Sequence, residues 1–164
     1  MKTNRLAILL LALAAACGGG AEKEAATAQE EQAVQEEVPA VVEVVIEAND
    51  QMKYNLDRID VKAGQKVKLT LKHVGQLPVE SMGHNWVLLK QGTDVAEFAT
   101  AAINHKDNGY IDPAKADQVI VKTEMIGGGQ ETTIEFDAPE KGIYDFICTF
   151  PGHYSMMKGK FVVM

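Results

Sequence analysis

The C-terminal end of the chain brings together three side chains that bind soft metals. Cys148, His153 and Met157 fall within ten residues, around the turn-forming pair Pro151-Gly152. A thiolate, an imidazole and a thioether are soft or borderline ligands, and one Cys, two His and a distant Met form the ligand set of copper electron-transfer sites. The segment therefore predicts such a site, provided that a second histidine comes from elsewhere in the chain.

His84 is the candidate for that second histidine. It lies 64 residues before Cys148, at the head of the apolar segment 86–90, where a Greek-key fold would bring it beside the C-terminal loop. By itself, a Cys at the end of a strand is most often a small buried side chain, and a single His is most often a hydrogen-bonded polar group. Together with His153 and Met157, the two residues favour a metal site.

The elements that must position these ligands are predicted to be strands. Residues 66–73 alternate strictly between polar and apolar side chains, as a strand with one buried face requires. Further strands are expected at residues 41–47, 86–90, 119–122, 132–137, 142–148 and 159–163. About seven short strands separated by turns predict an all-β fold, a Greek-key sandwich or barrel.

One helix is expected within an insertion between strands, because five apolar residues share one helical face. These are Val95, Phe98, Ala99, Ala102 and Ile103. The glycine-rich segment 126–130 is interpreted as a hairpin turn rather than a phosphate-binding loop, since no helix start or Lys-Ser/Thr pair follows it.

The N-terminus is predicted to be a targeting signal. Lys2 and Arg5 precede an eleven-residue apolar run at 6–16, which is shorter than the roughly 20 residues needed to span a bilayer but suits a secretory signal. The run ends in Leu-Ala-Ala-Ala-Cys, which resembles the lipobox of bacterial lipoproteins, so we expect residues 1–16 to be removed and Cys17 to be lipidated. The alternative is an ordinary secretory peptide cut near Ala16, which leaves a soluble periplasmic protein with a free thiol.

Residues 17–40 are predicted to form a flexible acidic tether and residues 41–164 the working domain. The stretch 18–40 has six Glu against one Lys and little apolar surface, so it cannot fold by itself, with a partial helix as the alternative. The whole chain carries 16 Lys+Arg and 23 Asp+Glu, a net charge of −7. This acidic balance argues against binding to nucleic acid, which requires clustered basic side chains.

Two segments of the domain resemble the azurins, type 1 blue copper proteins of the cupredoxin family. They are Gly83-His84-Asn85-Trp86-Val87-Leu88 and Cys148-Thr149-Phe150-Pro151-Gly152-His153 followed by Met157-Lys158-Gly159. The similarity extends over essentially all of residues 41–164. The resemblance implies an eight-stranded Greek-key cupredoxin with one helical flap.

The same resemblance implies the arrangement of the copper site. His84, Cys148 and His153 would hold copper in a plane, with Met157 as a long axial ligand and the Gly83 carbonyl opposite. A copper ion ligated in this way has no open coordination position for a substrate. We therefore expect that the protein is not an enzyme and binds no small-molecule substrate. The expected function is the transfer of single electrons in the periplasm or outer cell envelope, with membrane anchoring through Cys17.

The resemblance further implies the residues around the ligands. Asn85, Thr149 and Phe150 would support them: the backbone amides of Asn85 and Phe150 would hydrogen-bond to the Cys148 sulfur, and the Asn85 side chain would join the two copper loops. Redox proteins such as c-type cytochromes or copper reductases and oxidases would dock where His153 reaches the surface. The expected apolar patch there comprises Met52, Leu77, Met82, Phe150, Pro151 and Met156, although several of these residues are alternatively part of the core.

The chain departs from the azurin pattern at several positions. Val42 and Gln65 stand where azurins usually carry a disulfide, and Lys122 replaces a histidine beside the patch. His73 matches a histidine whose protonation follows the redox state in some azurins, and a packed strand histidine is the alternative. His105 is expected at the surface.

Two other functions use some of the same residues. A copper chaperone or scavenger of the cell envelope would use the same ligands, although chaperones generally favour exposed Met and His ligands over a buried thiolate. A thiol enzyme built on Cys148 and His153 lacks a third, orienting group and leaves His84 and Met157 unexplained.

Overall fold

The computed structural model describes residues 40–164. The predicted signal peptide at 1–16, the predicted lipidation of Cys17 and all but the last residue of the predicted tether at 17–40 lie outside this range and stay predictions. Within residues 40–164, no helix has the length and apolar character needed to cross a membrane.

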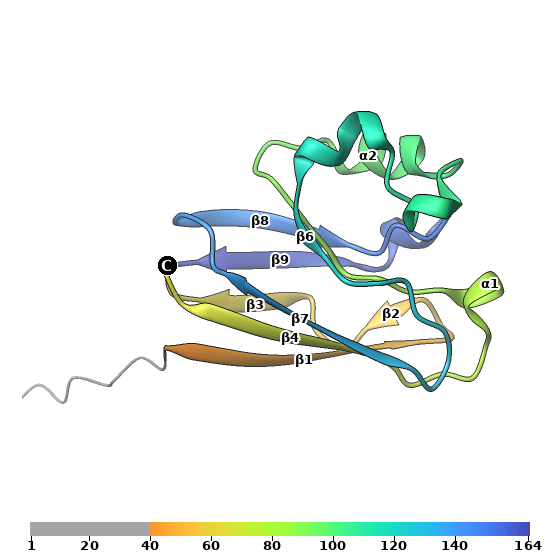
Figure 1. Cartoon of the computed structure of the whole chain (residues 1–164), viewed down its shortest axis with the longest axis horizontal. Coiled ribbons are helices and arrows are strands. Elements are labelled where there is room, and N and C mark those ends of the chain that lie inside the picture. The colour runs from red at the N-terminus through yellow and green to blue at the C-terminus, as the bar shows by residue number, and fades with distance from the viewer. Residues whose placement is uncertain (1–39) are drawn as a thin grey trace, which may run out of the picture. The chain divides into compact units, whose positions relative to one another are not determined.

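Two β-sheets pack against each other with the main core between them (Figure 1). The first sheet has the order β2-β1-β4-β7, with β1 (Val41–Asn49), β2 (Lys53–Tyr54), β4 (Lys66–His73) and β7 (Glu131–Asp137). The second has the order β3-β9-β8-β5-β6, with β3 (Arg58–Val61), β5 (Val87–Leu89), β6 (Val119–Lys122), β8 (Gly142–Ile147) and β9 (Lys158–Val163). Strand β1 runs parallel to β4 and β3 parallel to β9, and the other pairs are antiparallel.

The all-β sandwich expected from the sequence is confirmed, and all seven expected strands are present with bounds shifted by at most two residues. The described residues contain nine strands, which are the seven expected ones together with β2 and β3. The resemblance implied eight. These two strands are only two and four residues long, so they carry too little alternation to be predicted.

Strand β4 shows how the alternating pattern sets the register. Val67, Leu69 and Leu71 face the core, and His73 continues the same buried row toward the end of the strand. The opposite face of the sheet carries ion pairs between neighbouring strands, such as Lys66 with Asp137 at 2.9 Å. A shift of one residue would place the charged row inside, so the register that carries His73 inward is strongly specified.

The core contains a cluster of aromatic rings around Trp86, which is fully buried. Its ring centroid lies 5.5 Å from that of Phe146, 6.0 Å from Phe136 and 6.2 Å from Phe161. Full burial of a large apolar side chain contributes roughly 1.5–3 kcal/mol. The cluster therefore stabilises the chain directly after His84. Among residues 40–164 the one cysteine, Cys148, is a free thiol.

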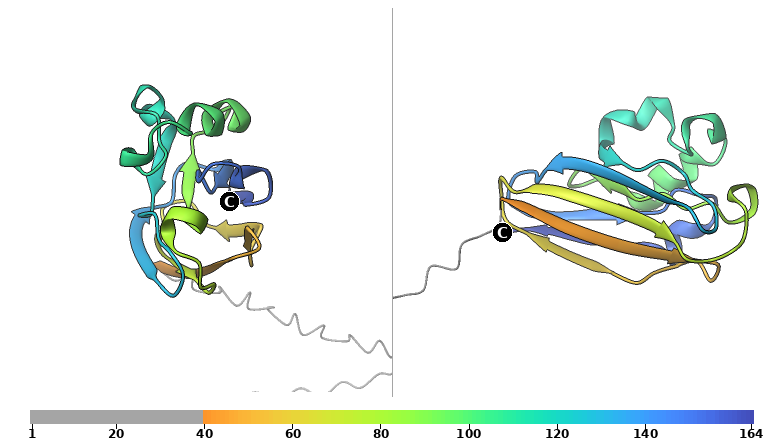
Figure 2. Two further views of the ribbon diagram at one scale, coloured as in Figure 1. Left: turned by 90° about the vertical axis from the view of Figure 1, so that its right-hand side faces the viewer. Right: turned by 60° about the horizontal axis from the view of Figure 1, so that its bottom comes forward.

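The predicted helix is confirmed as α2 (Val95–Ala102), which ends one residue earlier than expected. Asp94 caps it by accepting a hydrogen bond from the Glu97 amide at 3.0 Å. The apolar face of α2 packs on the outer side of the second sheet, against Val87, Leu89 and Ile147 (Figure 2). Two short 3-10 helices, η1 (Lys106–Asn108) and η2 (Pro113–Gln118), complete the insertion between β5 and β6.

The hairpin expected at 126–130 is wrong. Gln130 N donates to Gly127 O at 3.1 Å, so the segment contains a β-turn, but the strands on either side, β6 and β7, belong to different sheets. The segment crosses between the sheets and pairs Ile126 with His84. Two short helices that the sequence did not predict, α1 (Val79–Met82) and η3 (His153–Ser155), complete the loops beside the ligands.

Candidate metal centre

Three of the predicted ligands converge in the folded chain. The Cys148 Sγ atom lies 3.9 Å from Nδ1 of His84 and 3.7 Å from Nδ1 of His153. The Gly83 carbonyl oxygen is 3.9 Å from the same sulfur. Cys148 and His84 are fully buried, and His153 is 3% exposed.

The spacing of these atoms fits one metal ion. An ion bound about 2.0–2.3 Å from each nitrogen and sulfur donor keeps the donors roughly 3.5–4 Å apart in a plane. The donor atoms of His84, Cys148 and His153 all lie within 4.8 Å of one another, and no other cluster of three His, Cys, Asp or Glu residues in the described range has this property. The residues present therefore fit a copper ion, which prefers this mixture of imidazole and thiolate.

Two loops position the ligands. His84 lies between α1 and β5 and is held by a two-bond bridge, in which its amide donates to Ile126 O at 3.0 Å and its carbonyl accepts from Ile126 N at 2.9 Å. Cys148 follows β8 directly, and its amide donates to Met157 O at 3.0 Å. The Met157 amide donates to His153 O at 2.8 Å, so the loop from 148 to 157 closes on itself and keeps the Met157 side chain fully buried.

Both histidines are prepared as neutral ligands. Nε2 of His84 donates to the Asn49 carbonyl at 2.9 Å, which leaves Nδ1 without a proton and facing Cys148. Burial lowers the pKa of His84 to about 4, and burial likewise lowers the pKa of His153 to about 4. Both rings are therefore uncharged at neutral pH and able to bind a metal.

Cys148 carries a proton until a metal arrives. Burial raises the pKa of its thiol to about 11, against the opposite effect of hydrogen bonds from the backbone amides of Asn85 and Phe150. A coordinating metal ion deprotonates a thiol outright. Metal binding at neutral pH therefore requires the loss of this proton.

Asn85 and Thr149 join the two ligand loops. The Thr149 amide donates to Asn85 Oδ1 at 2.9 Å, and Asn85 Nδ2 donates to Thr149 Oγ1 at 2.8 Å. Both side chains are about 1% exposed. Because each residue directly follows a ligand, this pair of hydrogen bonds fixes the separation between His84 and Cys148.

Glycine is required at position 83 by close packing. A Cβ atom there would lie 2.7 Å from the Val79 carbonyl oxygen and 3.0 Å from both Met125 Sδ and a ring carbon of Phe150. A larger residue would push the loop outward and move the Gly83 carbonyl away from the sulfur. The glycine thus allows the backbone to approach the ligands.

The residues of the expected apolar patch differ in exposure. Leu77 and Met156 are 42% and 51% exposed, and the others, Met52, Met82, Phe150 and Pro151, are half-buried. Met52 also packs against the main core, in agreement with the alternative interpretation of this residue. His153 is covered by the Phe150 ring, whose centroid lies 4.6 Å away, so only a small part of the imidazole meets solvent.

His73 is tied into the structure through both ring nitrogens. Nδ1 accepts from the Gly75 amide at 3.1 Å, and Nε2 donates to the Met82 carbonyl at 2.9 Å. The ring also stacks on His84, with centroids 4.4 Å apart. These contacts are those of a packed strand histidine that supports a ligand.

His105 is about one-third exposed, and its Nε2 atom lies 3.5 Å from Asp112 Oδ1.

Several groups at the site were not predicted from the sequence. Asn49 and Gly109 act through backbone carbonyls, which no side-chain pattern reveals, and Tyr54 donates its hydroxyl proton to the Asn85 carbonyl. The only signal for Tyr54 was its place within residues 41–164, over which the chain resembles the azurins.

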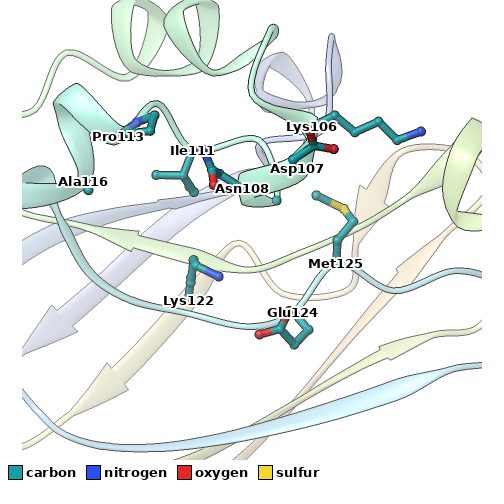
Figure 3. A pocket seen from close by; sticks show the side chains of 10 residues that line it. Lys106, Asp107, Asn108, Ile111, Pro113, Ala116, Lys122, Glu124 and Met125 are labelled. Carbon is teal, nitrogen blue, oxygen red and sulfur yellow. The ribbon is translucent and has the colours of Figure 1, made fainter.

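A pocket of about 590 Å³ opens between the insertion and the segment that includes β6 (Figure 3). Its lining includes Lys106 and Ile111 on one side and Lys122, Glu124 and Met125 on the other. None of the predicted ligands lines it. The metal centre is therefore buried beside this pocket rather than placed in it.

Known proteins share this sequence and fold. Residues 40–164 match the family described as copper binding proteins, plastocyanin/azurin family. Outer membrane protein H.8 of Neisseria gonorrhoeae is 41% identical over 119 residues, which are 70% of this chain and 63% of that protein, so the chain spans less than two thirds of this relative. Azurin of Achromobacter denitrificans is 40% identical over 124 residues, 73% of this chain and 83% of that protein.

Solved structures agree in fold. Auracyanin A, a "blue" copper protein of Chloroflexus aurantiacus, superposes with a TM-score of 0.69 at 30% identity over 76% of this chain and 99% of that chain. An azurin of Methylomonas sp. strain J superposes with a TM-score of 0.66 at 32% identity over 74% of this chain and 97% of that chain.

Proposed function

This chain belongs to the plastocyanin/azurin family of copper-binding proteins, and we propose that it carries single electrons between redox proteins at the bacterial cell envelope. As a member of this family the chain is a copper-binding electron carrier rather than an enzyme, and His84, Cys148 and His153 form a cluster that fits its copper ion. Met157 is the proposed fourth ligand. The observation that carries the proposal is the convergence of Cys148 Sγ with the unprotonated Nδ1 of His84 and the ring of His153 in a buried, preformed arrangement.

The arrangement of the ligands suits a site whose charge changes by one. Copper supplies the one-electron change between Cu(II) and Cu(I) when it is bound. His84 is fixed by Asn49 and Ile126, and Cys148 is fixed through Met157. Since the ligands are held by hydrogen bonds on both loops, they move little between the two charge states, and burial keeps water away from them.

We propose that electrons leave through the edge of His153. The Phe150 ring covers this histidine, and the most exposed apolar side chains of the patch are Leu77 and Met156. A small apolar contact suits brief encounters, in which a partner must bind and leave quickly. c-Type cytochromes and copper reductases or oxidases are the partners proposed for this surface.

The proposed location is the periplasm or outer envelope, with an anchor at lipidated Cys17. This proposal rests on the sequence of residues 1–17 and on the relative named outer membrane protein H.8. Residues 18–40 would then act as the tether between the lipid and the copper domain. An unlipidated, soluble periplasmic form is the alternative, and mass spectrometry of the mature N-terminus separates the two.

The burial of the ligands favours an electron carrier over the two rival functions. A copper chaperone must release its metal. Cys148 and His84, however, are fully buried, and the residues that follow them, Thr149 and Asn85, are hydrogen-bonded to each other. A thiol enzyme needs an accessible thiolate, whereas the pKa of Cys148 is raised to about 11. The first observation disfavours release of the metal, and the second disfavours nucleophilic attack by the Cys148 sulfur.

The deciding experiment is to add Cu(II) to the purified protein. We expect an intense blue colour, a narrow copper hyperfine splitting in the electron paramagnetic resonance spectrum and rapid electron exchange with a c-type cytochrome. A weakly coloured site that exchanges its copper quickly with a chelator would favour the chaperone and reject the proposal.

A further inference from the structure

The helical insertion contacts both ligand loops through two consecutive residues, Gly109 and Tyr110, which we name the 109–110 corner. The Gly109 carbonyl accepts one hydrogen bond from Asn85 Nδ2 at 3.3 Å and a second from Thr149 Oγ1 at 3.2 Å. Gly109 also lines the pocket of Figure 3. The corner therefore lies between that pocket and the loops that carry the ligands.

The Gly109 carbonyl completes a buried hydrogen-bond network. The Thr149 hydroxyl accepts a hydrogen bond from Asn85 Nδ2 and donates one to the Gly109 carbonyl oxygen. Asn85 and Thr149 are each only 1% exposed, so water does not replace this acceptor. Loss of the corner would leave a buried donor without a partner on the residue next to Cys148.

Tyr110 supports the second histidine through aromatic contacts. Its ring meets Phe150 edge to face, with centroids 5.3 Å apart and an interplanar angle of 65°. Phe150 in turn packs on His153, with centroids 4.6 Å apart. The corner thus reaches His84 and Cys148 through hydrogen bonds and His153 through two rings.

The backbone of the corner is held in an unfavourable conformation. Gly109 has φ 64° and Tyr110 has φ 56°, so two consecutive residues are left-handed, and Tyr110 is not a glycine. The conformation is maintained by hydrogen bonds from Gly109 N to Lys106 O at 3.0 Å and from Tyr110 N to His105 O at 2.9 Å. Such residues persist where the surrounding structure fixes them, and they gather at functional sites.

We propose that the 109–110 corner is a positioning element of the copper site, which holds the two ligand loops at a fixed separation and so limits their movement during electron transfer. This inference rests on the proposed function. It assigns to the insertion a role in the electron-transfer step, in addition to the packing of α2 on the second sheet.

The test compares Tyr110→Ala with Tyr110→Phe, which keeps the ring. Ile103→Ala is the matched control, because it removes a large apolar side chain from the same insertion at a position that is 46% exposed and lies outside the apolar cluster that includes Ile147 and Tyr154. Thr149→Val is a second variant, which keeps the side-chain shape and removes both the hydrogen bond to Gly109 O and the one accepted from Asn85 Nδ2. The readouts are hydrogen exchange of the Thr149 amide in the copper-free protein, and electron self-exchange in the copper-loaded protein.

We expect Tyr110→Ala and Thr149→Val to accelerate exchange of the Thr149 amide by about tenfold or more, because the local opening becomes easier. We expect the same two variants to slow electron self-exchange several-fold. Tyr110→Phe and Ile103→Ala should match the wild type in both measurements. If Tyr110→Ala does not fold, Tyr110→Leu takes its place, because it removes the aromatic contact with Phe150 while keeping an apolar side chain.

The proposal is overturned if the exchange rate of the Thr149 amide and the electron self-exchange rate are unchanged in Tyr110→Ala and Thr149→Val, or if Ile103→Ala changes both rates equally. Its failure differs from failure of the proposed function. In the latter case the wild type itself lacks the blue signal or the electron exchange, while amide exchange in the copper-free protein still reports on the corner.

Discussion

Nε2 of His84 donates a hydrogen bond to the carbonyl oxygen of Asn49 at 2.9 Å, although 35 residues separate the two positions. The bond places the ring proton on the nitrogen that faces away from Cys148. The other nitrogen, Nδ1, keeps its lone pair and points at the sulfur, 3.9 Å away. A backbone group at the end of β1 therefore sets the protonation of a ligand in advance of metal binding.

This arrangement predicts the number of protons that copper displaces. At pH 7 the two histidines are neutral, and only Cys148, with a pKa raised to about 11, holds a proton that the metal must displace. We expect Cu(II) binding to release about one proton, measured by calorimetry in buffers of different ionisation enthalpy. The Cys148→Ser variant should release none on any weak binding that remains. Release of two or more protons by the wild type at pH 7 would contradict this account.

The same histidines make the copper-free protein sensitive to acid. The pKa of His84 and of His153 is lowered from 6.5 to about 4 on folding, so between these values the unfolded chain binds more protons and the free energy of unfolding rises with pH. We expect a loss of up to about 3 kcal/mol for each histidine as the pH falls from about 6.5 to about 4. Below that range the histidines add no further loss.

Urea unfolding of the copper-free protein at several pH values measures this effect. The His153→Gln variant should show a shallower pH dependence, because one of the two groups has been removed. A free energy of unfolding that is flat between pH 6.5 and pH 4, or that increases on acidification, would refute the assignment of two buried neutral histidines.

Replacement of the thiol tests the principal ligand. Cys148→Ser should abolish the intense blue absorption, because a serine hydroxyl is a hard and weakly acidic donor that does not provide the sulfur-to-copper charge transfer. Visible and electron paramagnetic resonance spectra of the copper-loaded variant provide the measurement. Persistent blue colour in this variant would show that another residue supplies the sulfur.

Replacement of the thioether tests the weaker ligand. Met157→Leu should keep the colour, since the equatorial ligands remain, and should raise the reduction potential, because loss of a donor destabilises Cu(II) more than Cu(I). Protein-film voltammetry measures the change. An unchanged potential would indicate that the Met157 sulfur is not a ligand.

The proposed docking patch predicts a change in rate without a change in spectrum. Met156→Lys places a charge on a side chain that is 51% exposed, and it should slow electron transfer to a c-type cytochrome by about tenfold. Ile143→Lys is the matched control, because Ile143 lies on β8 and is 59% exposed outside the patch. Stopped-flow kinetics compare the two. Equal rates in both variants would place the docking surface elsewhere.

Much of the site was predictable because its information is local. The ligand types and their spacing after Cys148 specify the metal chemistry, and the strict alternation at 66–73 specifies a strand with one buried face. The helical spacing of apolar residues likewise predicted α2. Such patterns depend on side-chain identity within short segments, which the sequence displays directly.

The tertiary structure decided what depends on backbone groups and long-range register. Asn49 and Gly109 act through carbonyl oxygens, which every residue has, so no sequence pattern marks them. The segment 126–130 was predicted as a hairpin, yet it crosses between sheets and brings Ile126 to His84, because strand pairing far along the chain sets its direction. The sequence by itself thus indicated which side chains are candidate ligands, and folding decided how those side chains are oriented, which of them are neutral and how they are held.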